Sequence, residues 1–171
     1  DKEIRLQAHY GLWLYYLRTG ELDKALEHAQ SMCELARSIT DEEAMATGLR
    51  ILGVSLHFLG RHDVGRDYLQ QSLDWYEHGE LSHSFRFGLD QESAGQAFLS
   101  RLLWLQGEYK AAKQMAWRGV KKAARLQHVC SLCCALAEGA CMTAALDRNP
   151  RWVIKAANWL IHLAKRHDLY F

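Results

Sequence analysis

Proline is nearly absent from this sequence of 171 residues, in which Pro150 is the single example. Because proline interrupts helix interiors and central strands alike, its scarcity leaves long stretches free to form regular helices. Ala, Leu, Gln, Glu, Lys and Arg fill those stretches, and the strict apolar–polar alternation typical of strands is missing. The sequence therefore predicts an all-α protein.

An excess of one charge and long apolar runs are lacking too. Lys and Arg number 21 against 20 Asp and Glu, so the net charge of +1 gives no general reason to bind nucleic acid or an anionic membrane. The nearest basic cluster, Lys121, Lys122 and Arg125, is interpreted as a solvated helix end, where the helix dipole favours cations. No uninterrupted apolar run approaches the roughly 18 residues needed to span a bilayer. We expect a cytoplasmic protein without a nucleic-acid or membrane partner.

The five cysteines form no disulfide framework, which favours a reducing compartment. Cys130 and Cys133 are three residues apart, so their thiolates share one helical face and could bind zinc. No second pair with this spacing exists, and Cys141 lies two turns beyond Cys133. We favour buried thiols that act as small hydrophobes, and expect no metal and no cofactor; a zinc or redox module centred on Cys130 and Cys133 stays open as an alternative.

Three internal repeats, each centred on a glycine, organise the helical stretches. Residues that are apolar or small, apart from His62, recur at the same offsets from Gly20, Gly60 and Gly107. The three sets are Leu12, Tyr16, Leu22, Ala25, Ala29 and Cys33; Leu52, Leu56, His62, Gly65, Leu69 and Leu73; Leu99, Leu103, Tyr109, Ala112, Ala116 and Val120. Identical offsets in three places indicate one structural unit used repeatedly.

The spacing has a physical reason. A glycine can end a helix in the left-handed backbone conformation, which allows a tight turn into an antiparallel second helix. Five residues after that glycine stands a small residue, Ala25, Gly65 or Ala112, which lets the second helix approach the first closely. Each repeat is therefore predicted to be an antiparallel helix pair.

These repeats resemble the tetratricopeptide (TPR) repeat, and Leu52-Gly53 reproduces the small-residue signature of its first helix. We expect a single TPR-like domain over 1–171, a right-handed superhelical α-solenoid of about eight helices. The expected pairs cover about 3–37, 42–78, 90–126 and 128–167. The fourth pair lacks a central glycine and is inferred from the turn before Pro150. The start at Asp1, without Met, suggests a segment excised from a longer chain.

Two further motifs resemble one particular family. Phe87-Gly88-Leu89-Asp90 and Leu103-Trp104-Leu105-Gln106-Gly107 are similar to the C-terminal helical region of large bacterial signalling proteins. In that family a winged-helix or nucleotide-cyclase domain precedes a nucleotide-hydrolysing switch domain, and TPR-like repeats follow. The resemblance implies a regulatory arm. No Gly-x-x-x-x-Gly-Lys-Ser/Thr phosphate loop occurs in these residues, so we expect no catalytic residues here.

The first helix of each pair should line a concave surface, as in other stacked repeats. The positions expected to face it are Tyr10, Leu14, Arg50, Val54, His57, Arg101 and Trp104. Aromatic and Arg side chains supply much of the energy of protein interfaces, so we expect a protein or peptide partner, either a separate one or the protein's own switch domain. A small-ligand sensor with a cleft near Trp104, or a free-standing TPR adaptor, is the alternative. His57 and His62 flank a turn, where packing is favoured over acid–base chemistry.

Overall fold

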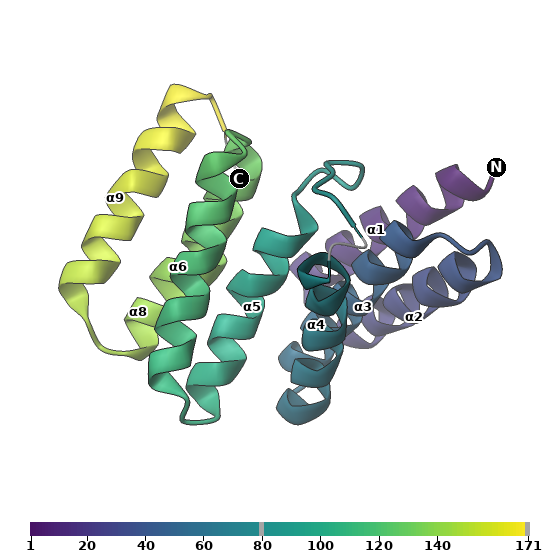
Figure 1. Cartoon of the computed structure of the whole chain (residues 1–171), viewed down its shortest axis with the longest axis horizontal. Coiled ribbons are helices and arrows are strands. Elements are labelled where there is room, and N and C mark those ends of the chain that lie inside the picture. The colour runs from purple at the N-terminus through teal and green to yellow at the C-terminus, as the bar shows by residue number, and fades with distance from the viewer. Residues whose placement is uncertain (79–80, 170–171) are drawn as a thin grey trace. The chain divides into compact units, whose positions relative to one another are not determined.

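The computed structural model describes residues 1–78 and 81–169, and within these ranges the protein is all-α, with no strand. The first four helices are α1 (Lys2–Thr19), α2 (Leu22–Ser38), α3 (Glu42–Phe58) and α4 (His62–Glu77) (Figure 1). They are followed by α5 (Gln91–Leu105), α6 (Tyr109–Arg125), α7 (Val129–Cys134), η1 (Ala135–Cys141), α8 (Met142–Leu146) and α9 (Pro150–Arg166). The predicted all-α, TPR-like fold class is confirmed.

The last pair contains an irregularity. The segment η1 is a π-helix, and it joins α7 and α8 into one continuous helical rod because the residues at both junctions keep right-handed helical dihedrals. The described residues thus form eight helical rods in four antiparallel pairs, and the bounds of these rods agree with the expected pairs to within about two residues, the usual uncertainty of helix ends.

Side-chain caps begin the first helix of the second, third and fourth pairs. The Asp41 carboxylate accepts a hydrogen bond from the Ala44 amide at 2.9 Å, and the Asp90 carboxylate accepts one from the Ser93 amide at 2.8 Å. The His128 ring does the same for Ser131 in α7. These side chains satisfy helix amides that have no intrahelical partner, and so fix where each pair starts.

The turns within the first three pairs use glycine in the left-handed conformation. Gly20, Gly60 and Gly107 have φ values of 81°, 78° and 86°. A side chain at such a φ is strained, which accounts for glycine at these points. The turn of the fourth pair uses Arg148 at φ 51° instead, followed by Asn149 as N-cap and Pro150 as the first helical residue.

The contacts divide the chain into two compact units, Asp1–Ser82 and His83–Phe171. The N-terminal unit holds α1 to α4 and the C-terminal unit holds α5 to α9. Whether they behave as the single domain expected over 1–171 stays a prediction.

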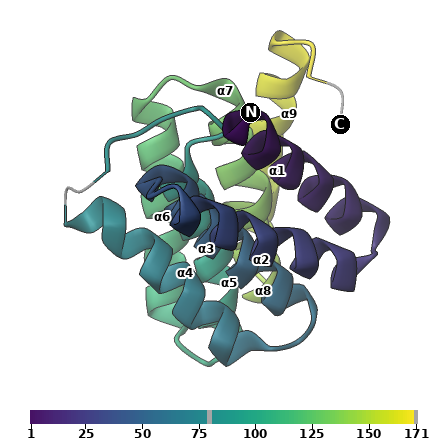
Figure 2. The ribbon, with the colours of Figure 1, turned by 90° about the vertical axis from the view of Figure 1, so that its right-hand side faces the viewer.

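In the N-terminal unit, each helix packs against the next, and Figure 2 shows α2 running back along α1 after the turn. A close backbone approach joins α3 to α4: a Cβ on Gly53 would lie 2.7 Å from the Gly65 carbonyl oxygen. Buried hydrogen bonds add specificity to this core. The Trp13 indole donates to the Ser55 hydroxyl at 2.9 Å, and the Ser72 hydroxyl donates to the Ala46 carbonyl at 2.7 Å.

In the C-terminal unit, η1 is the central element and packs against α5, α6 and α9. A Cβ on Gly139 would lie 3.2 Å from Ala97, so the π-helix sits close against α5. By length and composition alone, the rod Val129–Leu146 could cross a membrane. The sequence prediction missed it because Glu138 interrupts the apolar run. In this structure the rod supplies Leu132, Leu136 and Ala140 to a protein core.

Candidate protein-interaction surfaces

The first helices of the N-terminal unit carry five of the seven residues expected to bind a partner. On α1, Leu14 is exposed and Tyr10 is half-buried; on α3, Arg50, Val54 and His57 are buried. The Arg50 guanidinium donates a hydrogen bond to the Tyr10 hydroxyl at 3.3 Å and lies 5.4 Å from the centre of the Trp13 ring. Arg50 therefore has its hydrogen-bond and cation–π partners inside its own unit.

His57 also has its polar partner inside its own unit. Its Nδ1 lies 3.2 Å from the Nδ1 of His62 across the Gly60 turn, a distance at which one ring donates and the other accepts. His62 begins α4, so this contact ties the two helices together at the turn. A structural role at the turn fits this geometry.

In the C-terminal unit, Arg101 and Trp104 of α5 are the expected binding residues. The Arg101 guanidinium donates to the Glu138 carboxylate of η1 at 2.8 Å, and burial lowers the pKa of Arg101 while the charge of Glu138 opposes that shift. Trp104 is half-buried beside the Tyr109 ring, and its indole N–H has no acceptor among the described residues. Leu14, Tyr10 and Trp104 thus remain the accessible members of the expected set, whose binding role stays a prediction.

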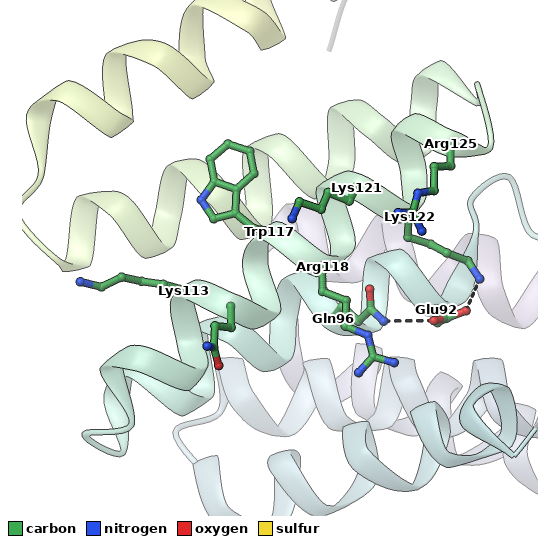
Figure 3. Close-up of a pocket in the computed structure, with 9 residues that line it drawn as sticks. Glu92, Gln96, Lys113, Trp117, Arg118, Lys121, Lys122 and Arg125 are labelled. Atoms are coloured by element: carbon green, nitrogen blue, oxygen red, sulfur yellow. Dashed lines mark hydrogen bonds and ion pairs between the residues drawn. The ribbon is translucent and has the colours of Figure 1, made fainter.

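A basic cleft of about 710 Å³ opens beside the start of α5 and along α6 (Figure 3). We call it the α6 cleft; its main lining residues are Glu92, Gln96, Trp117, Arg118, Lys121 and Arg125. Glu92 forms an ion pair with Lys122 at 2.5 Å and accepts a hydrogen bond from the Gln96 amide at 3.1 Å. Cations outnumber carboxylates on its walls, which makes it an attractive site for negative charge.

A smaller and more apolar hollow of about 260 Å³ adjoins this cleft. We call it the tryptophan slot; it lies between α6, the η1–α8 rod and α9. Its apolar lining residues are Ala116, Trp117, Ala140, Ala144, Trp152 and Ala156, and its polar ones are Lys113, Thr143, Asp147 and Asn149. The Trp117 and Trp152 rings meet edge to face with centres 5.4 Å apart. Because Trp117 also lines the α6 cleft, the two hollows share a wall.

Sequence reasoning missed both hollows, although a signal was present. Lys113, Trp117, Lys121 and Arg125 recur every four residues, a spacing that places them along one face of α6. The interpretation of Lys121, Lys122 and Arg125 as a solvated helix end overlooked the tryptophan in this row. The partner of Lys122, Glu92, comes from another helix and has no sequence signal.

The cysteines show no sign of a reactive site. All five are free thiols, and burial raises the pKa of Cys33 to about 11. Burial also raises the pKa of Cys133 and of Cys141. A raised thiol pKa lowers the fraction of nucleophilic, metal-binding thiolate at neutral pH. Within residues 1–78 and 81–169, no three His, Cys, Asp or Glu side chains are placed to hold a metal ion.

Comparison with known proteins supports the fold. No family model matches the chain, and no curated protein matches it. Among solved structures, it is similar to BtubC (BKLC) from P. vanneervenii, with a TM-score of 0.65 and 15% identity over 100% of this chain and 67% of that one. It is also similar to a putative kinesin light chain from Podosopora anserina with nearly identical TPR-like repeats, with a TM-score of 0.65 and 14% identity over 98% and 78% of the two chains. The chain has a TPR-like helical-repeat fold.

Proposed function

We propose that this chain is a non-catalytic protein-binding module that regulates a larger bacterial signalling protein in the cytoplasm. The observation that carries the proposal is the TPR-like stack of helix pairs, which presents hollows lined by aromatic and charged side chains. Stacked repeats of this kind present extended surfaces suited to protein partners. The motifs around Phe87-Gly88-Leu89-Asp90 and Trp104 support the signalling context.

A small-ligand sensor is less well supported. The tryptophan slot, at about 260 Å³, is smaller than the roughly 300–1,000 Å³ of ordinary ligand pockets. The α6 cleft is large enough at about 710 Å³, but cationic side chains dominate its walls, whereas small-molecule pockets are mostly apolar. Both hollows fit parts of a protein partner better than a buried metabolite.

The regulatory proposal is tested with the complete gene product. We expect its reading frame to encode a nucleotide-hydrolysing switch domain, and removal of residues 1–171 to raise the rate of nucleotide hydrolysis several-fold, on the order of the coupling energies of allosteric proteins. Absence of such a domain, or an unchanged rate, would contradict the proposal.

Accessible residues of the first helices provide the variants for this experiment. Arg50→Glu and Arg101→Glu would bury a carboxylate and unfold their units, so they cannot report on binding. Leu14→Asp places a charge on an exposed position of α1 instead, and should raise the rate of nucleotide hydrolysis as the deletion does. Ile4→Asp, on the same helix and 64% exposed, is the matched control and should leave inhibition intact.

A further inference from the structure

The near-neutral net charge conceals a strong division between the two units. Residues 1–82 contain eight Lys and Arg against fourteen Asp and Glu, a formal charge of −6, whereas residues 83–171 contain thirteen against six, a formal charge of +7. A unit with such an excess of one charge attracts oppositely charged partners although the whole chain carries only +1.

The positive charge concentrates on α6 and α9. These two helices hold ten Lys and Arg residues and no Asp or Glu. Two of the cations that line the hollows form ion pairs with carboxylates from other parts of the unit. Lys122 pairs with Glu92 at 2.5 Å, and Lys113 pairs with Asp147 at 2.8 Å. Lys121 and Arg125 in the α6 cleft have no carboxylate partner among the described residues. The cleft therefore keeps an uncompensated positive charge.

The shape of the surface identifies the kind of anion. The basic cleft continues at Trp117 into the tryptophan slot, whose apolar lining is made of alanines and two tryptophans. A ligand that fills both needs negative groups followed by a compact apolar group. An acidic protein segment with one apolar side chain has this composition. Lipid head groups on a membrane present a broad surface, which does not match side chains gathered in a hollow.

Single-stranded nucleic acid fits less well, because it needs open aromatic faces on which bases can stack. The Trp117 ring meets Trp152 edge to face, and the Lys155 ammonium lies 5.0 Å from the centre of the Trp152 ring. These contacts occupy part of the ring surface on which bases would stack.

We propose that the α6 cleft and the tryptophan slot together bind an acidic protein segment, whose carboxylates pair with Lys121 and Arg125 and whose apolar side chain enters the slot. The inference rests on the proposed function in so far as the chain is a protein-binding module. It adds that the partner segment is acidic. It also places the binding side chains on α6 and α9, the second helices of their pairs, apart from the first-helix residues Leu14 and Trp104.

The test uses two fluorescein-labelled peptides and the whole chain. One peptide alternates Glu and Ser with a single central Leu, and the other replaces that Leu by Ser. Fluorescence anisotropy should show the Leu peptide binding at low salt, with affinity falling about tenfold or more as salt rises and screens the charges. Lys121→Glu/Arg125→Glu should weaken both peptides about tenfold or more, as loss of paired charges does at interfaces.

Two matched variants separate the cleft and the slot from general charge. Lys165→Glu/Arg166→Glu makes the same change in net charge at the C-terminal end of α9, outside both hollows, and should alter affinity by less than about twofold. Trp152→Ala removes an exposed ring from the slot, and should weaken the Leu peptide about fivefold or more but leave the Ser peptide unchanged. Circular dichroism checks that each variant is folded.

Several results would overturn the inference. These are binding of neither peptide, equal losses from the cleft and control variants, or tighter binding of an oligothymidylate or of phosphatidylserine vesicles than of the Leu peptide. Salt-dependent self-association that the cleft variant abolishes, without peptide binding, would assign the cleft to a second copy instead. If the peptides fail but residues 1–171 still inhibit nucleotide hydrolysis, only this inference fails; if the peptides bind and no inhibition exists, the regulatory proposal fails.

Discussion

Gly53 and Gly65 mark the point where α3 and α4 touch backbone to backbone. The sequence singled out both residues, one from the Leu-Gly signature and one from its distance to Gly60. The structure adds the partner atoms, since a Cβ on Gly53 would meet the Gly65 carbonyl oxygen at 2.7 Å and Leu69 Cγ at 2.8 Å. Neither backbone nor buried leucine can move aside without shifting a helix.

Gly53→Ala should therefore destabilise the protein by about 1–3 kcal/mol, the usual cost of overpacking, despite the better helix propensity of alanine. Gly11→Ala is the matched control: Gly11 is an exposed residue in α1, and a Cβ there meets no atom within 4 Å. That variant should be neutral or stabilising by up to about 1 kcal/mol. Urea unfolding followed by circular dichroism measures both, and equal effects would contradict the close-approach explanation.

His9 provides a test of pH dependence. Its Nδ1 lies 3.2 Å from the Nδ1 of His28, and its pKa is lowered from 6.5 by burial first and then by the charges of His28 and Arg5. The unfolded chain thus takes up the proton more readily than the folded one, so stability falls as pH drops through and below 6.5. Urea unfolding at several pH values should show this fall, and His9→Gln should reduce it. An unchanged pH dependence would contradict the assignment.

Thiol reactivity follows from burial. Cys33 is buried, with its pKa raised to about 11, so almost no thiolate exists at neutral pH. A maleimide reagent at neutral pH should modify the half-buried Cys130 and Cys134 first and Cys33 only after unfolding. Mass spectrometry of peptides after timed labelling measures the order. Early modification of Cys33 would contradict the buried position of its thiol.

At the scale of elements, the π-helix η1 is the feature that sequence could not predict. Helical periodicity locates the rod 129–146, but whether a helical turn widens into a π-helix depends on packing against the neighbouring helices. Here η1 brings Gly139 against Ala97 and directs Glu138 to Arg101. Both contacts involve α5, about forty residues away in sequence. The helix ends, by contrast, were predictable because Asp41, Asp90 and Pro150 act locally.

The Arg101–Glu138 pair should support this element measurably. Glu138→Ala leaves the largely buried Arg101 charge without its carboxylate partner, and should cost about 1–3 kcal/mol of stability. Glu21→Ala removes the exposed pair with Lys24 and should leave stability nearly unchanged, because solvent screens surface pairs. Urea unfolding compares the two variants. A cost for Glu138→Ala no larger than for Glu21→Ala would show that the buried pair adds nothing.

At the scale of the whole molecule, the sequence predicted the fold better than the surface. Glycines with equal offsets and local caps determine helix pairing, and both are visible along the chain. The partners of Arg50, His57 and Arg101 cannot be seen along the chain, because they depend on which helices pack together. The charge division is present in the sequence, but it emerges only when the boundary near Ser82 is known.

The charge division predicts chromatographic behaviour. Near pH 7.8, where the net charge of the chain vanishes, the basic C-terminal unit should still retain the protein on a cation exchanger at low salt. Lys121→Glu/Arg125→Glu should elute at lower salt than Lys2→Glu/Arg18→Glu, which makes the same change in net charge in the acidic unit. Identical elution of the two variants would show that net charge alone governs retention.

Three turns, those after α2, α6 and α8, each contain a residue other than glycine in the left-handed conformation. These residues are Thr40, Gln127 and Arg148, with φ values of 56°, 54° and 51°. Each such side chain costs roughly 1 kcal/mol relative to glycine. Glycine would adopt the same backbone conformation without this strain. Replacing these three residues by glycine offers a direct route to a more thermostable scaffold that retains every surface side chain proposed to bind a partner.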